Sequence, residues 1–145
     1  MSTGLSVFDT TVQESNAWLA AVEDHLKPCD RQQAYAGLRA ALHALRDRLP
    51  TEGVISLSAQ LPMLLRGLFL EGWSPHPAGG ERSQQEFCAT IAERLPPAYP
   101  REANAVAEAV FAVITDKVDP GEARKLITQL PAPLRPLWPE ILWAV

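Results

Sequence analysis

The stretch AQLPMLLRGLF at residues 59–69 returns, with substitutions, as TQLPAPLRPLW at residues 128–138. Gln, Leu, Pro, Leu, Arg and Leu recur at matched places, so the offset is 69 residues, from 59 to 128. The register continues upstream without a gap, from residues 16–69 to residues 85–138, and roughly a quarter of the matched positions are identical. This pattern predicts an internal duplication, with two modules related by a pseudo-twofold axis.

Helix signals occur along the whole chain, and strand signals are nearly absent. Capping boxes are expected at Ser6 with Asp9, at Asp30 and at Ser83, because these side chains can accept from free backbone amides of a first helical turn. Asp119 precedes a proline and a glutamate, which is the strongest helix start in the chain. The expected helices are 6–26, 30–49, 51–60, 62–72, 83–95, 101–118, 119–130 and 131–138.

These helices predict an all-α fold: two pseudo-symmetric four-helix modules packed as one helical bundle. The expected single domain spans residues 1–145, divided into a first module 6–73, a linker 74–82, a second module 83–138 and an apolar tail 139–145. Prolines are denser in the last helix of the second module than in its counterpart. We expect that helix to be shortened or kinked.

The composition describes a compact globular protein of 145 residues with a net charge of −4. An acidic chain without a basic block is a poor partner for nucleic acid. The two cysteines, Cys29 and Cys88, are expected as free thiols of a reducing compartment. Because neither a signal segment nor an apolar run of membrane-spanning length is present, a cytoplasmic location without membrane contact is expected.

One face of the second helix differs from its counterpart in the second half. Gly37, Ala41 and Ala44 form a stripe of small residues, whereas the matched positions are valines. A stripe of small residues and a stripe of valines can approach closely while still filling the space between them. We expect the two long helices to pack together there; the competing interpretation is that the valines form an exposed subunit interface. The matched valines are Val106, Val110 and Val113.

One charged pair is kept at the same spacing in both halves: Asp47 with Arg66, and Asp116 with Arg135. These residues are candidate structural ion pairs, because an arginine fork suits a partly buried carboxylate. The alternative is that each pair forms one of two symmetric sites for an anion or a peptide.

Two tryptophans lack an aromatic partner in the repeat and indicate a candidate interaction surface. Trp73 ends the first module, and Trp143 lies in an apolar C-terminal segment. A free end this apolar has to dock on its own bundle or on a partner. The candidate surface consists of Trp73, Ile141, Leu142, Trp143 and Val145.

The sequence offers little chemistry. No histidine has the spacing of a metal site, and neither a nucleophile motif nor a phosphate-cradling loop occurs. We therefore expect no enzyme activity, no catalytic residue, no metal and no cofactor.

Several motifs together resemble the bacterial family known as domain of unknown function 2267. They are residues 38–49, then Gln-Leu-Pro from Gln60, Leu-Arg-Gly from Leu65 and Glu-Gly-Trp from Glu71, and in the second half Pro-Gly-Glu from Pro120 and residues 129–138. The resemblance covers nearly the whole chain. It implies an all-helical protein without an assigned activity, so it carries over no catalytic or binding residue.

The leading functional prediction is a non-enzymatic protein–protein interaction or scaffold module, with self-association as one option. A second hypothesis is a regulatory nucleic-acid-binding protein that uses a basic helix face. That face would consist of Arg39, His43, Arg46 and Arg48. A third is a pocket between the modules that binds a small ligand or catalyses a reaction.

Overall fold

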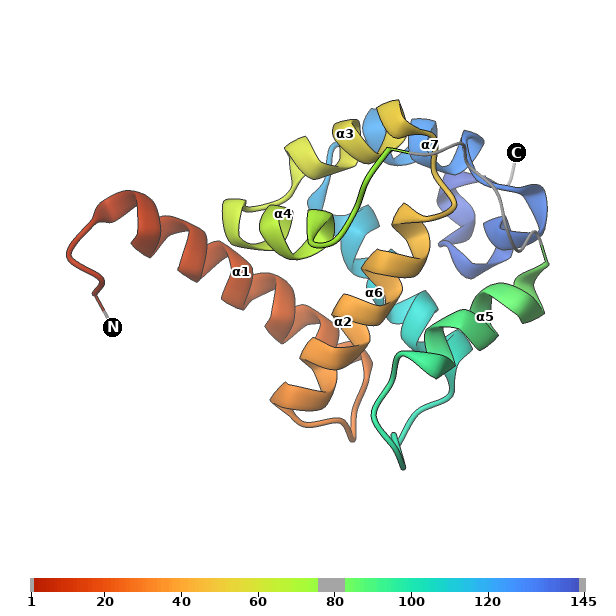
Figure 1. Ribbon diagram of the computed structural model, residues 1–145, viewed down its shortest axis with the longest axis horizontal. Helices are drawn as coiled ribbons and strands as arrows, with labels where there is room; N and C mark the ends of the chain where they lie inside the picture. Colours follow the sequence, from red (N-terminus) through yellow and green to blue (C-terminus); the bar gives the residue numbers. More distant parts are fainter. Residues whose placement is uncertain (1, 76–82, 144–145) are drawn as a thin grey trace.

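The computed structural model describes residues 2–75 and 83–143, and within these ranges the chain is helical and forms no strand (Figure 1). Most of the predicted linker and the end of the tail lie outside the described residues. The α-helices are α1 (Ser6–His25), α2 (Arg31–Arg46), α3 (Thr51–Gln60), α4 (Met63–Leu70), α5 (Gln84–Glu93), α6 (Ala103–Lys117) and α7 (Pro120–Thr128). Two 3₁₀ helices follow, η1 (Ala132–Leu137) and η2 (Glu140–Leu142).

The helix starts follow the capping residues at three of the predicted places. Asp30 and Gln33 form a reciprocal capping box at α2, Ser83 accepts from Glu86 N at α5, and Asp119 caps α7 ahead of a first-turn proline. The box predicted at Ser6 is wrong. Ser6 is already helical, and the Asp9 carboxylate instead accepts from Thr3 N at 2.6 Å, just before the helix.

The two long central helices, α2 and α6, pack against each other (Figure 1). A Cβ added to Gly37 would lie 3.2 Å from Val106 Cγ1, so the helices approach each other closely at this glycine. The expected contact is confirmed there. Every other residue of the two stripes is buried, so the valines form no exposed interface; these residues are Ala41, Ala44, Val110 and Val113.

Contacts between the two halves of the chain extend beyond this central pair. α1 packs on α6, α5 packs on α2, and α3 lies against α7. The loop before α6 reaches the corner between α1 and α2: Tyr99 Oη donates to Gln33 O at 2.6 Å, and Arg101 Nη1 donates to Lys27 O at 2.9 Å. Burial raises the pKa of the Tyr99 phenol well above its usual range, so this donor stays protonated.

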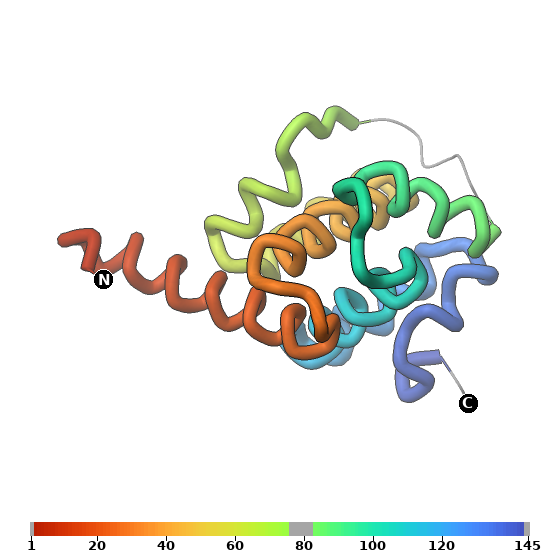
Figure 2. Tube along the Cα trace, turned by 90° about the horizontal axis from the view of Figure 1, so that it is seen from below, coloured from red at the N-terminus to blue at the C-terminus, as the bar shows by residue number. Residues whose placement is uncertain are grey.

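α1 extends beyond the body of the protein. Its C-terminal half packs into the core through Trp18 and Val22, and Thr11 Oγ1 accepts from Leu64 N at the start of α4 at 2.9 Å, whereas the turns before Thr11 project away from the other helices (Figures 1 and 2). In the part of the chain that the structure describes, no helix is long and apolar enough to cross a membrane.

Candidate interaction surface

The N-terminal half of α1 carries exposed apolar side chains. Phe8 is 51% exposed and Val12 is 37% exposed, and Leu5, directly before the helix, is 49% exposed. Phe8 and Val12 are four residues apart, so they lie one above the other on one face of the helix. A compact protein normally covers such a row of side chains.

An apolar groove begins where this row of side chains ends. α1 contributes Ser15 and Leu19, α2 contributes Tyr35 and Leu38, and α4 contributes leucines including Leu64. The groove has a volume of about 390 Å³ and is open to solvent. Tyr35 is 45% exposed and Leu64 is 55% exposed, so two large side chains on the groove remain half uncovered.

The exposed row and the groove share one continuous helix face. Phe8, Val12, Ser15 and Leu19 are spaced by four, three and four residues, which is the spacing of a single helical stripe. We call these four residues the α1 stripe. The Ser15 side chain is buried, and its hydroxyl has no hydrogen-bond partner.

Charged side chains flank the α1 stripe and the groove. Arg31 donates to Asn16 Oδ1 at one side, and Arg39 Nη2 lies 3.1 Å from Glu71 Oε1 at the other. The Thr3 backbone amide holds the pKa of Asp9 below its usual value, so this exposed carboxylate is negative at neutral pH.

The predicted C-terminal surface is placed differently from the α1 stripe. Trp143 Nε1 donates to Trp138 O at 2.8 Å, and Leu142 and Trp143 pack half-buried against the chain's own core. Ile141 is 74% exposed, Trp73 is half-buried, and Val145 lies outside the described residues. The tail therefore docks on its own bundle as far as Trp143 and leaves a single large apolar side chain uncovered.

The helix face that was considered for nucleic acid points partly inward. His43 and Arg46 are 5% and 8% exposed, and both bond to carbonyl oxygens at the end of α4. His43 Nε2 donates to Leu68 O at 2.8 Å, and Arg46 Nη1 donates to Phe69 O at 3.0 Å and to Glu71 O at 2.7 Å. Both side chains therefore take part in internal contacts, so the proposed basic face is not presented to solvent as one surface.

Neither predicted ion pair forms. Asp47 lies 3.3 Å from Arg46 Nε and 3.1 Å from Arg94 Nη2, whereas Arg66 Nε donates to Ser58 O at 2.9 Å. Arg66 sits on the first turns of α4, so its side chain reaches back to the carbonyls that end α3 rather than across to α2.

The second pair fails for another reason. Asp116 is exposed near the end of α6, whereas the Arg135 Nε atom is buried without a hydrogen-bond partner. The equal spacing in the sequence does not bring these two side chains together.

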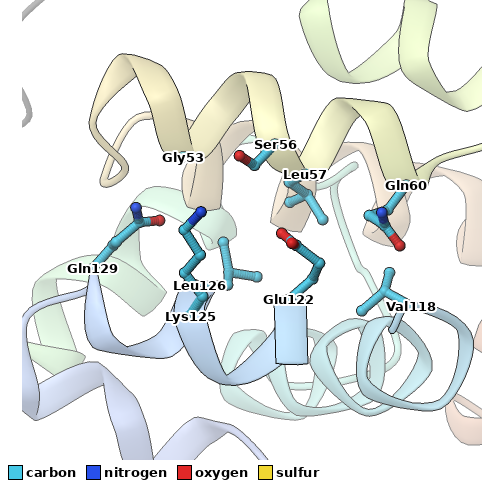
Figure 3. Close-up of a pocket in the computed structure, with 9 residues that line it drawn as sticks. All are labelled: Gly53, Ser56, Leu57, Gln60, Val118, Glu122, Lys125, Leu126 and Gln129. Carbon is cyan, nitrogen blue, oxygen red and sulfur yellow. The ribbon is translucent and has the colours of Figure 1, made fainter. Parts of the chain in front are cut away.

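A crevice between α3 and α7 lies where the two halves of the chain meet (Figure 3). Side chains from both helices point toward each other across it, and its volume is about 10 Å³, which is room for about one water molecule. Gln129 closes it from below Gly53, since a Cβ at that glycine would lie 2.6 Å from Gln129 Oε1. The crevice is too small to bind an organic ligand.

Sequence reasoning missed the α1 stripe, although its spacing was readable. The residues described contain no group of three side chains suited to a metal ion. Cys29 and Cys88 are free thiols. The candidate site is therefore an exposed apolar helix face that continues into an apolar groove. The fold and this site describe a helical protein with an uncovered apolar surface.

Residues 15–137 match the family described as an uncharacterized conserved protein, DUF2267, and the chain belongs to this family. A comparison with curated proteins found no match. The projecting first turns of α1 and the C-terminal tail lie outside the matched residues, whereas the groove lies within them.

Proposed function

We propose that this protein is a non-enzymatic interaction module that binds a protein partner through the α1 stripe and the adjoining groove. The observation that carries the proposal is the exposure of Phe8 and Val12 on a helix face that runs into an open apolar groove. Burying one such side chain contributes roughly 1.5–3 kcal/mol, so the chain loses stabilisation by leaving this face in water unless a partner covers it.

The rival functions have less support. Two of the four residues considered for nucleic acid, His43 and Arg46, bond to the end of α4, and the net charge of −4 opposes phosphate binding. The crevice between the two halves has a volume of about 10 Å³, which does not suit a ligand or a catalytic pocket. The free thiols are consistent with a cytoplasmic location, which we keep as part of the proposal.

The duplication is also part of this proposal, with modules 6–73 and 83–138 around a pseudo-twofold axis. Packing between equivalent elements supports it: α2 lies on α6, α3 lies on α7, and the contact of α1 with α6 is mirrored by that of α5 with α2. The small crevice is lined by matched residues at an offset of 69: Gly53 and Glu122, Ser56 and Lys125, Leu57 and Leu126, Gln60 and Gln129. In the sequence, the positions 69 residues after Phe8 and Val12 hold Pro77 and Glu81, so the exposed pair of the α1 stripe is not repeated in the second half of the sequence.

Affinity capture from the native cell tests the proposal with a matched pair of variants. Phe8→Glu places a charge on the α1 stripe. Val7→Glu adds the same charge to a similarly exposed residue, 47% against 51%, about 100° around the helix. We expect the captured protein partner to be lost with Phe8→Glu and retained with Val7→Glu. Equal capture by the wild type and both variants would refute an interaction through this face.

A further inference from the structure

We propose that the partner of the α1 stripe is a second copy of this chain, bound about a twofold axis with the two α1 helices antiparallel. This inference rests on the proposed function and names its partner. Every α1 stripe in such a dimer would be covered by the groove of the other copy, and every groove by the other copy's stripe.

The register of the stripe is self-complementary. Phe8 and Leu19 are equally far from the midpoint between Val12 and Ser15. When two antiparallel copies meet at that midpoint, Phe8 of each faces Leu19 of the other, and Val12 lies over the helix turn of the other copy that holds Ser15, whose side chain is already buried in its own chain. A single twofold axis therefore forms both contacts between Phe8 and Leu19 at once, as an isologous interface requires.

The groove supplies the cavity for this arrangement. Leu19 is part of its wall, so a phenyl ring opposite Leu19 enters between Tyr35 of α2 and Leu64 of α4. The volume of about 390 Å³ exceeds that of one aromatic side chain, which leaves room for Leu5 beside the ring. The half-exposed residues of the helix and of the groove are covered by the same contact, and the twofold axis forms this contact twice in the dimer.

Charges at the side of the stripe are complementary in the same register. Asp9 lies next to Phe8 on the flank that also carries Asn16, and Arg31 donates to Asn16. Antiparallel pairing brings Asp9 of one copy toward Asn16 and Arg31 of the other. α1 itself carries no lysine or arginine, so Arg31 on α2 provides the cation that a second acidic helix needs.

Sedimentation velocity and light scattering on the purified chain test the dimer at about 100 μM, which populates complexes of micromolar dissociation constant. We expect the wild type at twice its mass of 15.9 kDa. Phe8→Glu should raise the dissociation constant at least roughly tenfold, as for a central aromatic anchor, while Val7→Glu leaves it unchanged. Helical circular dichroism and melting temperature should stay at wild-type values, because residue 8 is exposed.

A charge exchange tests the register. Asp9→Arg and Arg31→Asp should each weaken the dimer, by roughly threefold or more, and the double variant should restore it. Restoration supports the antiparallel arrangement. A double variant weaker than both single variants overturns it.

Three results overturn the inference: a monomeric wild type, a dimer unaffected by Phe8→Glu, or equal dissociation by Val7→Glu. A monomeric chain that still captures another protein in a Phe8-dependent way refutes the second copy and leaves the proposed function standing. A Phe8-dependent dimer whose capture recovers no other protein supports the second copy and limits the module to self-association.

Discussion

Two segments of the molecule begin after the same Gln-Leu-Pro sequence and adopt different helices. α4 is an α-helix of eight residues, whereas η1 is a 3₁₀ helix of six. Both place leucines in the core and are followed or ended by a buried aromatic residue, Phe69 in the first case and Trp138 in the second. The difference therefore does not arise from the apolar side chains.

The backbone of the second segment lacks amide donors. Pro136 lies within it and Pro139 follows it, and each of these two prolines removes an N–H group that a continuing α-helix would need, whereas the first-turn Pro133 removes one that would have no helical partner. α4 contains no proline, since Pro62 is its N-cap residue. The same core pattern is thus compatible with two helix types, and the hydrogen-bonding capacity of the backbone selects between them.

The end of α4 also receives side-chain donors from α2. His43 and Arg46 bond to its last carbonyls, whereas the positions 69 residues later on α6 hold Ala112 and Thr115. The Thr115 hydroxyl donates to Phe111 O within its own helix. A long α-helix end beneath α6 would have no such donors, which is consistent with a shorter segment there.

The largest expected effect comes from removing the Arg46 guanidinium, which donates to the end of α4 and has no counterpart at η1. Arg46→Met leaves Phe69 O and Glu71 O without their donor, and we expect a loss of about 2–4 kcal/mol in the free energy of unfolding. Arg39→Met on the same helix removes only an exposed pair with Glu71 and should cost less than about 1 kcal/mol. Urea denaturation measures both, and equal losses would contradict the capping role.

The matched arginines of the two segments should respond differently to the same substitution. Arg66→Met removes hydrogen bonds to Ser58 O and Leu61 O and should cost about 1 kcal/mol. Arg135→Met removes a buried Nε atom that has no partner, so stability should stay the same or rise. Thermal melts of the two variants make the comparison. A larger loss of stability for Arg135→Met than for Arg66→Met would contradict this expectation.

The smallest expected effect is a pH dependence of stability that comes from His43, which lies on α2 and bonds to the end of α4. The matched position on α6 is Ala112, so η1 has no equivalent titrating group. Burial lowers the pKa of His43, nearby arginines add to this, and the bond to Leu68 O opposes it. Because the folded pKa lies below the unfolded value of about 6.5, the unfolded chain binds the proton first as the pH falls. Stability should therefore decrease below about pH 6.5 until the folded imidazole also titrates. His43→Gln should remove this part of the dependence in denaturation measured from pH 7 to 5, and an unchanged slope would contradict it.

Local signals predicted the helix limits well. Asp30, Ser83 and Asp119 act within a few residues of themselves, and α3 has the predicted limits of 51–60. The contact at Gly37 was also predictable, because the matched positions of the two sequence halves set a stripe of small residues against a stripe of valines. In these cases the deciding interaction is short in sequence, or the comparison of matched sequence positions points to the second surface.

Side-chain partners across the fold were not predictable in this way. Arg46 read as a surface residue because nothing in α2 reveals that the end of α4 lies over it. Arg66 was assigned to Asp47 by spacing alone, whereas its long side chain reaches the nearer carbonyls of α3. The spacing of Phe8 and Val12 indicates a helix face, but its exposure depends on which elements stop short of it.

The interleaving of the two halves has a consequence for how the chain folds. α6 supplies part of the surface on which α1 and α2 rest, and Arg101 and Tyr99 hold the corner between those two helices. Contacts this distant in sequence raise the contact order of a helical protein, and the buried residues of both halves form one core cluster. The body of the molecule should therefore unfold as one cooperative unit, with uniform hydrogen-exchange protection across α2 and α6, while the first turns of α1 exchange by local opening alone.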